Sequence, residues 1–103
     1  MFRLDGRVAL VSGAGRGMGL GVARALAAQG AKVVVNDYFP DRAAAAVQAL
    51  RESGLTVCAA PGDITQADVR QQIVATARAE FGTIDILVHN LSLIHISEPT
   101  RPY

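Results

Sequence analysis

The sequence predicts an α/β fold in which a mostly parallel sheet of about four strands carries helices on both faces. Short aliphatic and β-branched runs alternate with segments of a dozen or so residues that have helical spacing. Glycines end the helical segments, and half of the 103 residues are hydrophobic, which is enough to bury a core. Right-handed crossover connections within one domain are therefore expected.

Four short segments are expected to be strands, and the first of them has the composition of a strand that is buried on both faces of a parallel sheet. They cover residues 7–12, 31–36, 55–60 and 83–88. Cys58 is the only cysteine and falls in the third segment, so no intrachain disulfide can form. A buried thiol is the expected state.

The first helix is expected over residues 17–29. The apolar positions that recur every four residues are Met18, Val22 and Leu26. Gly21 and Ala25 lie between them, and such small residues allow close packing on a sheet.

Two further helical segments follow. The second begins at Pro40, a residue favoured at the first helical position, and ends before Gly54. Its apolar positions are Ala43, Ala46, Val47 and Leu50. The third is expected to begin with a capping box of Thr65 and Asp68 and to end at Gly82. One of its faces carries Val69, Ile73 and Ala77.

A glycine-rich turn over residues 12–19 joins the first strand to the first helix. Glycines allow left-handed dihedrals and, without a Cβ, let main-chain N–H groups approach phosphate oxygens. The helix N-terminus adds roughly half a positive charge, so a diphosphate fits there. Asp37 follows the second strand 18 positions after Gly19. That offset is close to the ~20 residues expected for an acid that accepts hydrogen bonds from the adenosine ribose.

The glycine spacing separates the known dinucleotide folds. The common G-x-G-x-x-G pattern fails at both possible starting glycines, whereas G-x-x-x-G-x-G fits Gly13, Gly17 and Gly19. With Ser12 before the first glycine, this turn resembles that of the short-chain dehydrogenase/reductase family.

The resemblance covers residues 3–90 and includes two later motifs. Asp63 and Ile64 match an Asp and an aliphatic residue that the family holds beside the adenine ring. The run ending in His89 and Asn90 resembles the family's fourth strand and its Asn-Asn-Ala-Gly motif. His89 stands at the first Asn position, and Asn90 matches the second, which lies near the nicotinamide-side ribose.

The resemblance implies a truncated Rossmann-type doubly wound sheet from an NAD(P)-dependent oxidoreductase, which transfers a hydride between a nicotinamide cofactor and an alcohol or ketone. In such an enzyme Ser12 would steady the turn, the N–H groups of residues 16–18 would face the pyrophosphate, and Asp37 would select the ribose. The implied cofactor-binding residues are Ser12, Gly13, Arg16, Gly17, Met18, Gly19, Asp37, Asp63, Ile64 and Asn90.

Asp37 favours NAD over NADP. A 2'-phosphate against its carboxylate would cost several kcal/mol at an effective dielectric of about 20. Arg16 points the other way, because family members that take NADP often hold a basic residue just before the second glycine. NAD is the expected cofactor.

The family's catalytic pair is absent from the sequence. The family uses Tyr-x-x-x-Lys, in which the lysine lowers the tyrosine pKa for proton transfer while a serine polarises the substrate oxygen. The only lysine is Lys32, and Ala28 stands four positions before it. Tyr38 and Arg42 have the spacing by coincidence, since arginine is too basic to replace the lysine. The chain by itself is therefore expected to be inactive, with no catalytic residue.

Residues 91–103 leave the family pattern after Asn90. Leu91 to Arg101 match an in-frame translation of the transposase-end adapter used to prepare sequencing libraries. We therefore expect residues 91–103 to be an adapter artefact. Residues 1–90 are expected to form the N-terminal part of a dinucleotide-binding domain. The alternative is a genuine divergent C-terminus.

Charge and composition limit the expected partners. Ten basic and nine acidic residues are scattered along the chain, so neither nucleic acid nor an anionic membrane is expected. Charged residues near the N-terminus and the lack of a spanning apolar run predict a cytoplasmic protein. No metal is expected. The expected partners are the nicotinamide dinucleotide and, in the intact enzyme, a small-molecule substrate and further copies in a homo-oligomer.

Two other functions stay open. A stand-alone dinucleotide-binding module without catalysis would require the C-terminal tail to be genuine. Another nucleotide-using α/β enzyme, such as a methyltransferase, also places a glycine turn before a helix and an acid after the second strand. The spacing of Gly13, Gly17 and Gly19 argues against the methyltransferase.

Overall fold

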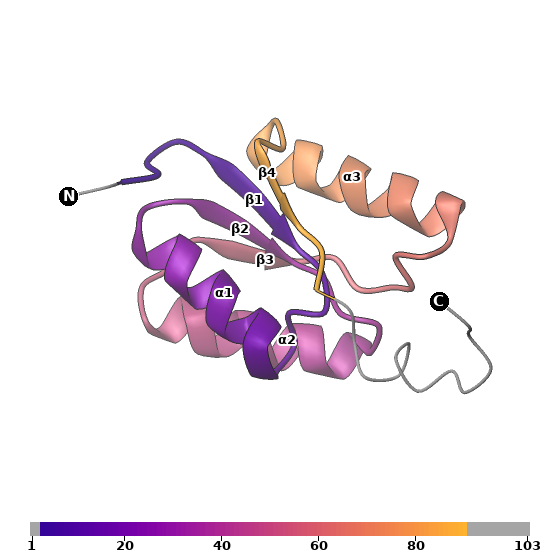
Figure 1. Cartoon of the computed structure of the whole chain (residues 1–103), viewed down its shortest axis with the longest axis horizontal. Helices are drawn as coiled ribbons and strands as arrows, with labels where there is room; N and C mark the ends of the chain where they lie inside the picture. Colours follow the sequence, from indigo (N-terminus) through magenta and orange to yellow (C-terminus); the bar gives the residue numbers. More distant parts are fainter. Residues whose placement is uncertain (1–2, 91–103) are drawn as a thin grey trace, which may run out of the picture.

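The computed structural model describes residues 3–90, which form a parallel sheet and three helices (Figure 1). The strands are β1 (Val8–Val11), β2 (Lys32–Val35), β3 (Val57–Ala59) and β4 (Ile86–Val88). The helices are α1 (Gly17–Ala28), α2 (Pro40–Glu52) and α3 (Ala67–Phe81). The predicted α/β fold is confirmed.

The strand order β3-β2-β1-β4 places β1 inside the sheet. β1 pairs in parallel with β2, where Val11 lies opposite Val35, and with β4, where Val11 lies opposite Val88. The chain therefore builds outward from β1 through β2 to β3 and then returns to place β4 on the other side of β1. This reversal is a topological switch point, and ligands of open α/β sheets bind at the carboxyl ends of the strands there.

Side chains of the strands alternate between two apolar layers, one on each face of the sheet. In the layer on the side of α1 and α2, the two central strands contribute Ala9, Val11, Val33 and Val35. In the layer on the side of α3, the same two strands contribute Val8, Leu10 and Val34. Figure 1 shows α1 and α2 on one face and α3 on the other. Because both faces are covered, the strands are continuous apolar runs in the sequence.

Helix α1 packs against the sheet through its smallest residues. Its buried positions are Gly19, Ala23 and Ala27. Met18 is 77% exposed, and Gly21 and Ala25 are also exposed, so the predicted packing face was wrong at these positions. Val22 and Leu26 lie partly buried beside the interface. Glycine and alanine carry little hydrophobic signal, so the larger side chains dominated the predicted pattern.

Helices α2 and α3 bury the faces that the sequence predicted, but α3 begins differently. α2 buries Ala43, Ala46, Val47 and Leu50. α3 buries Ile73 and Ala77, and Gly82 ends it with a φ of 89°. The predicted capping box is wrong, because Gln66 is the N-cap and Thr65 donates its hydroxyl to Asp63 Oδ1 at 2.6 Å.

Cys58 lies in β3 and is 5% exposed, which confirms the expected buried thiol. Desolvation and, to a smaller extent, the charge of Glu80 raise the thiol pKa from 9.0 to about 11, against the opposing effect of Arg51. The thiol is therefore protonated at neutral pH and poorly reactive.

We expect iodoacetamide to alkylate Cys58 about a hundredfold more slowly in the folded chain than in the guanidinium-unfolded chain at the same pH, because the thiolate fraction falls tenfold per pKa unit. Mass spectrometry of quenched samples measures both rates. The folded state favours the neutral thiol more than the unfolded state does. The free energy of unfolding should therefore fall as the pH rises from 9.0 to about 11. Equal alkylation rates in the two states would contradict the burial.

Candidate functional site

The candidate site lies where the chain leaves the carboxyl ends of β1, β2 and β4. The glycine turn follows β1, Asn36 and Asp37 follow β2, and His89 and Asn90 follow β4. Since all these strands are parallel, the segments meet at one edge of the sheet (Figure 1).

Each glycine of the G-x-x-x-G-x-G pattern has its own structural reason. Gly13 has a φ of 60°, and a Cβ there would lie 2.5 Å from the main-chain oxygen of Asn90. A Cβ at Gly19 would collide with the main-chain oxygen of Gly13. Gly17 has a φ of 63° and open space around the position of a Cβ. Two glycines thus permit close main-chain packing, and the third leaves the start of α1 accessible.

The turn also requires a glycine that the expected set did not include. A Cβ at Gly15 would lie 2.6 Å from Arg42 Cβ and 2.8 Å from Asp37 Cγ. Gly15 is therefore the point at which the turn lies closest to both the acid after β2 and the first turn of α2. The pattern search missed it because it stands at a variable position of the motif.

The main-chain amides of the turn fall into two groups. Ala14 donates to the main-chain oxygen of Asn36 at 2.7 Å, and Gly15 donates to Asp37 Oδ1 at 3.2 Å. The amides of Arg16, Gly17 and Met18 donate to no group within residues 3–90. These three are the ones that were expected to face a pyrophosphate.

The N-terminus of α1 is open to an anion. Arg16 is its N-cap residue but provides no side-chain cap, and the first turn contains no acidic residue. The partial positive charge of the helix end is therefore uncompensated by the residues that the structure describes. N–H groups without a partner in residues 3–90, together with this dipole, are the arrangement by which helix N-termini bind anions in other proteins.

Ser12 holds the start of the turn against the end of β4. The residue is 1% exposed, and its Oγ accepts a hydrogen bond from the main-chain N–H of Asn90 at 2.9 Å. His89 Nδ1 lies 3.1 Å from the same Oγ. Asn90 Nδ2 in turn donates to the main-chain oxygen of Gly13 at 3.3 Å. Ser12 and Asn90 thus link two segments that are far apart in the sequence.

Asp37 lies beside the glycine turn, 22 positions after Gly15 in the sequence. The residue is 5% exposed, and its two carboxylate oxygens accept hydrogen bonds from the amides of Gly15 at 3.2 Å and Phe39 at 3.0 Å. Each oxygen of an ionised carboxylate has two acceptor sites. Each oxygen therefore has acceptor capacity beyond the hydrogen bond that it already accepts.

Asn36 is a site residue that the motif search missed. It is 1% exposed, and its Nδ2 donates to the main-chain oxygens of Ala60 at 2.8 Å and Gly62 at 3.3 Å. The main-chain oxygen of Asn36 accepts a hydrogen bond from the Ala14 amide. The sequence signal was a polar residue directly after an apolar strand at the edge where ligands bind.

The loop after β3 brings Asp63 and Ile64 to the same edge of the sheet. Gly62 donates its amide to the main-chain oxygen of Asp37 at 3.0 Å. Asp63 Oδ1 accepts from the amide of Thr65 at 3.0 Å, and Ile64 packs against the apolar layer on the α3 side. The loop is therefore attached to the Asp37 segment through its main chain.

Other classes of site find no support in the part of the chain that the structure describes. No group of three or more His, Cys, Asp or Glu side chains within residues 3–90 could hold a metal ion. No helix in that range is both long and apolar enough to cross a membrane. Residues 91–103, for which an adapter origin was expected, lie outside the described residues.

Comparison with known proteins identifies related sequences. A family model for short chain dehydrogenase matches residues 7–101. D-beta-hydroxybutyrate dehydrogenase of Cupriavidus necator is 39% identical over 94 residues, which cover 91% of this chain and 36% of that protein. Galactitol 2-dehydrogenase of Agrobacterium fabrum is 40% identical over 95 residues, which cover 92% of this chain and 36% of that protein.

Solved structures show the same similarity. Hydroxysteroid dehydrogenase from Escherichia coli superposes with a TM-score of 0.85 at 36% identity, covering 88% of this chain and 39% of that one. L-Sorbose reductase from Gluconobacter frateurii, complexed with NADPH and L-sorbose, gives a TM-score of 0.83 at 32% identity, covering 88% and 35%. The chain thus spans less than two fifths of the length of these relatives.

The packing at Gly19 can be tested within one helix. Gly19→Ala should destabilise the chain by about 1–3 kcal/mol, because the new methyl group collides with the main chain of Gly13. Gly21→Ala is the matched control, since nothing lies within 4 Å of its added Cβ. It should stabilise the helix by roughly 0.5–1 kcal/mol. Urea denaturation followed by circular dichroism measures both, and equal shifts of the two midpoints would refute the close contact.

Proposed function

The chain belongs to the short chain dehydrogenase family, and from this we propose that it is the cofactor-binding part of an NAD(P)-dependent oxidoreductase. The intact enzyme would transfer a hydride between the nicotinamide and an alcohol or ketone. The observation that carries the proposal is that the amides of residues 16–18, at the uncapped start of α1, have no partner within residues 3–90.

The diphosphate of the cofactor would bind at these amides. Gly17 leaves open space in front of the helix end, so phosphate oxygens can reach the main chain. The exposed Arg16 side chain adds a positive charge at the same end of α1. Ser12 and Gly13 would act indirectly, by holding the turn in place through Asn90.

Asp37 would bind the adenosine ribose. Its carboxylate is already oriented by two main-chain amides, so little side-chain freedom is lost when ribose hydroxyls donate to it. A 2'-phosphate would bring negative charge towards the same carboxylate, and two charges 4 Å apart repel by about 4 kcal/mol at an effective dielectric of 20. This repulsion favours NAD over NADP.

Residues of the other two loops would complete the cofactor site. Asp63 and Ile64 would border the adenine, since their loop is attached to the Asp37 segment. Asn90 would lie on the nicotinamide side, at the end of β4. Bound nicotinamide supplies the hydride chemistry, and the chain's own residues position it.

We extend the proposal to the behaviour of the isolated chain and of the whole enzyme. Its sequence contains no Tyr-x-x-x-Lys pair, which supports binding without turnover by this chain. The whole enzyme would be a cytoplasmic homo-oligomer whose partners are a nicotinamide dinucleotide and a small-molecule substrate. Because the formal charge is only +1, nucleic-acid binding is not part of the proposal.

NADH titration of the chain and its Asp37→Asn variant tests the ribose contact. Fluorescence of the bound nucleotide should show an affinity about ten- to a hundredfold lower in the variant, because hydrogen bonds to an ionised group are worth about 1.5–3 kcal/mol. The preference for NADH over NADPH should also narrow.

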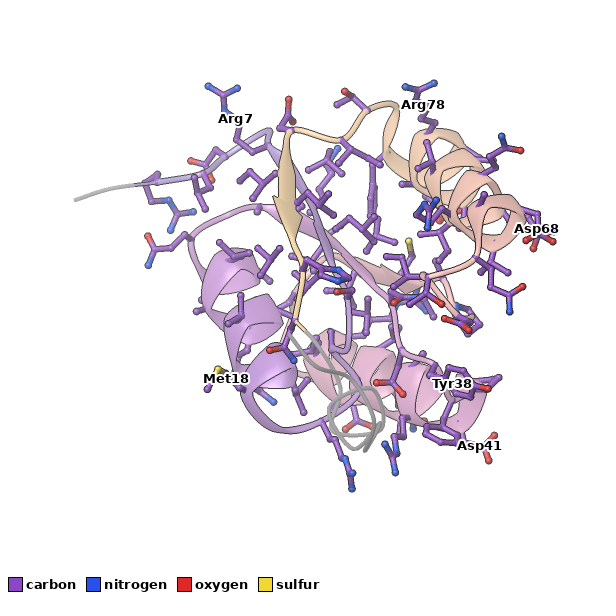
Figure 2. All side chains as sticks on the ribbon, turned by 45° about the vertical axis from the view of Figure 1, so that its right-hand side comes forward. Arg7, Met18, Tyr38, Asp41, Asp68 and Arg78 are labelled. Atoms are coloured by element: carbon purple, nitrogen blue, oxygen red, sulfur yellow. The ribbon has the colours of Figure 1, made fainter. Side chains whose placement is uncertain are left out.

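Asp41→Asn is the charge-matched control for this titration. Asp41 is exposed in the first turn of α2 and projects outward (Figure 2), so its loss should leave the NADH affinity within about twofold. Circular dichroism verifies that both variants are folded. Equal effects of the two variants would reduce the role of Asp37 to its net charge.

A stand-alone dinucleotide-binding module is the second candidate function, since the uncapped start of α1 and the position of Asp37 beside the turn would serve binding without catalysis equally well. Calorimetric titration with NADH, paired with an alcohol-oxidation assay, separates bare binding from turnover. We expect heat of binding and no turnover from this chain. Turnover above the rate of the buffer would contradict the expected inactivity and indicate another proton-transfer group.

A further inference from the structure

The loop between β3 and α3 is fixed to the rest of the candidate site at its start. The Gly62 amide donates to the main-chain oxygen of Asp37 at 3.0 Å. Asn36 Nδ2 donates to the main-chain oxygens of Ala60 and Gly62. A Cβ at Gly62 would lie 2.6 Å from Val69 Cγ1, so the first turn of α3 approaches the same point. The first half of the loop is therefore held by its neighbours on both β2 and α3.

The second half of the loop is held by the side chain of Arg70. Its Nη1 donates to the main-chain oxygens of Ile64 at 3.1 Å and Thr65 at 3.0 Å. The Thr65 amide donates to Asp63 Oδ1 at 3.0 Å, and the Gln66 amide donates to the main-chain oxygen of Asp63 at 3.1 Å. The consecutive peptide groups that join Asp63 to Gln66 are thus each fixed by a hydrogen bond.

Helix stability does not explain a cation at the position of Arg70. α3 begins at Ala67, so Arg70 lies near its N-terminal end, where the partial positive charge of the helix repels a cation. The two carbonyl contacts offset this repulsion, because each places the guanidinium beside a partial negative charge. The interactions of the Arg70 side chain are therefore directed at the loop.

The loop keeps one main-chain donor without a partner. The amide of Ile64 donates to no group within residues 3–90, whereas the carbonyl of the same residue accepts from Arg70. The Ile64 side chain packs against the apolar layer on the α3 side. The direction of the Ile64 N–H is therefore set by the loop conformation that the contacts of Arg70 maintain.

We propose that Arg70 is a positioning residue, which fixes the loop of Asp63 and Ile64 in the conformation that recognises the edge of the base. The inference rests on the proposed function, which assigns this loop to the adenine end of the dinucleotide. Arg70 acts through the loop and not by contact with the nucleotide. Without the guanidinium, the carbonyls of Ile64 and Thr65 lose their donor, so the peptide groups rotate and the base is bound with less discrimination.

The test compares NADH with reduced nicotinamide hypoxanthine dinucleotide by calorimetric titration of the full 103-residue chain. The hypoxanthine ring carries a hydrogen on the nitrogen that is an acceptor in adenine. A fixed N–H donor therefore distinguishes the two bases, and the parent chain should prefer NADH.

Arg70→Gln should lower the NADH affinity about three- to tenfold, the effect of one net hydrogen bond, and keep the affinity for the hypoxanthine analogue within about twofold. Arg70→Lys should restore most of the preference for NADH, because its ammonium group carries three donors that can serve both carbonyls.

Hydrogen exchange followed by mass spectrometry gives a measurement that does not depend on a nucleotide. The Thr65 amide should exchange faster in Arg70→Gln than in the parent chain, since the loop then opens more often. The amides of β1 should exchange at the parent rate. Unchanged exchange at Thr65 would contradict the positioning role.

Arg78→Gln is the matched control, because it removes the same charge from an exposed position in the last turn of α3, where the side chain projects outward (Figure 2). It should leave both affinities and the exchange of the loop unchanged. The inference is overturned if Arg70→Gln weakens both nucleotides by the same factor or weakens neither, or if the parent binds both equally well. Failure of the parent chain to bind either nucleotide would overturn the proposed function as well.

Discussion

The close approach of main-chain segments at the glycine turn is the constraint on which the candidate site depends. Gly19 packs against the carbonyl of Gly13, and Gly13 packs against the main chain of Asn90, at distances that leave no room for a Cβ. These contacts bring the start of α1 directly above the ends of β1 and β4. Without them the start of α1 could not pack this closely against the ends of the two strands.

Most polar side chains at the carboxyl edge of the sheet bind the protein's own main chain. Ser12 receives the amide of Asn90, and Asn36 donates to the main-chain oxygens of Ala60 and Gly62. Such bonds satisfy buried polar groups. They link the end of β1 to the loop after β4, and the loop after β2 to the loop after β3. The loops therefore form one preorganised surface in which few main-chain amides stay free for an anion.

The absence of a side chain at Gly15 leaves room for two charged neighbours of the turn. A Cβ at Gly15 would lie 2.6 Å from Arg42 Cβ and 2.8 Å from Asp37 Cγ. The main-chain amides of Gly15 and Phe39 orient the carboxylate of Asp37, and the guanidinium of Arg42 stacks on the Phe39 ring. A carboxylate and a cation therefore border the same turn.

Sequence patterns were sufficient for the elements but not for every contact. The burial of β1 on both faces, the apolar face of α2 and the end of α3 at Gly82 were predicted correctly, since β-branched runs, helical spacing and a left-handed glycine are local signals. The face of α1 was wrong because its contacts are glycine and alanine. The capping box failed because Gln66, one residue after Thr65, is the N-cap of α3.

The sequence by itself determined the fold class, the position of the glycine turn and the presence of an acid after the second strand. Only the tertiary structure decided which amides have no partner within residues 3–90, that Asn36 connects three loops, and that Asp37 and Arg42 both lie against Gly15. The reason is physical: hydrophobic periodicity and turn preferences act over a few residues. Distances between loops depend on how the strands pair, and this pairing is visible only in the folded chain.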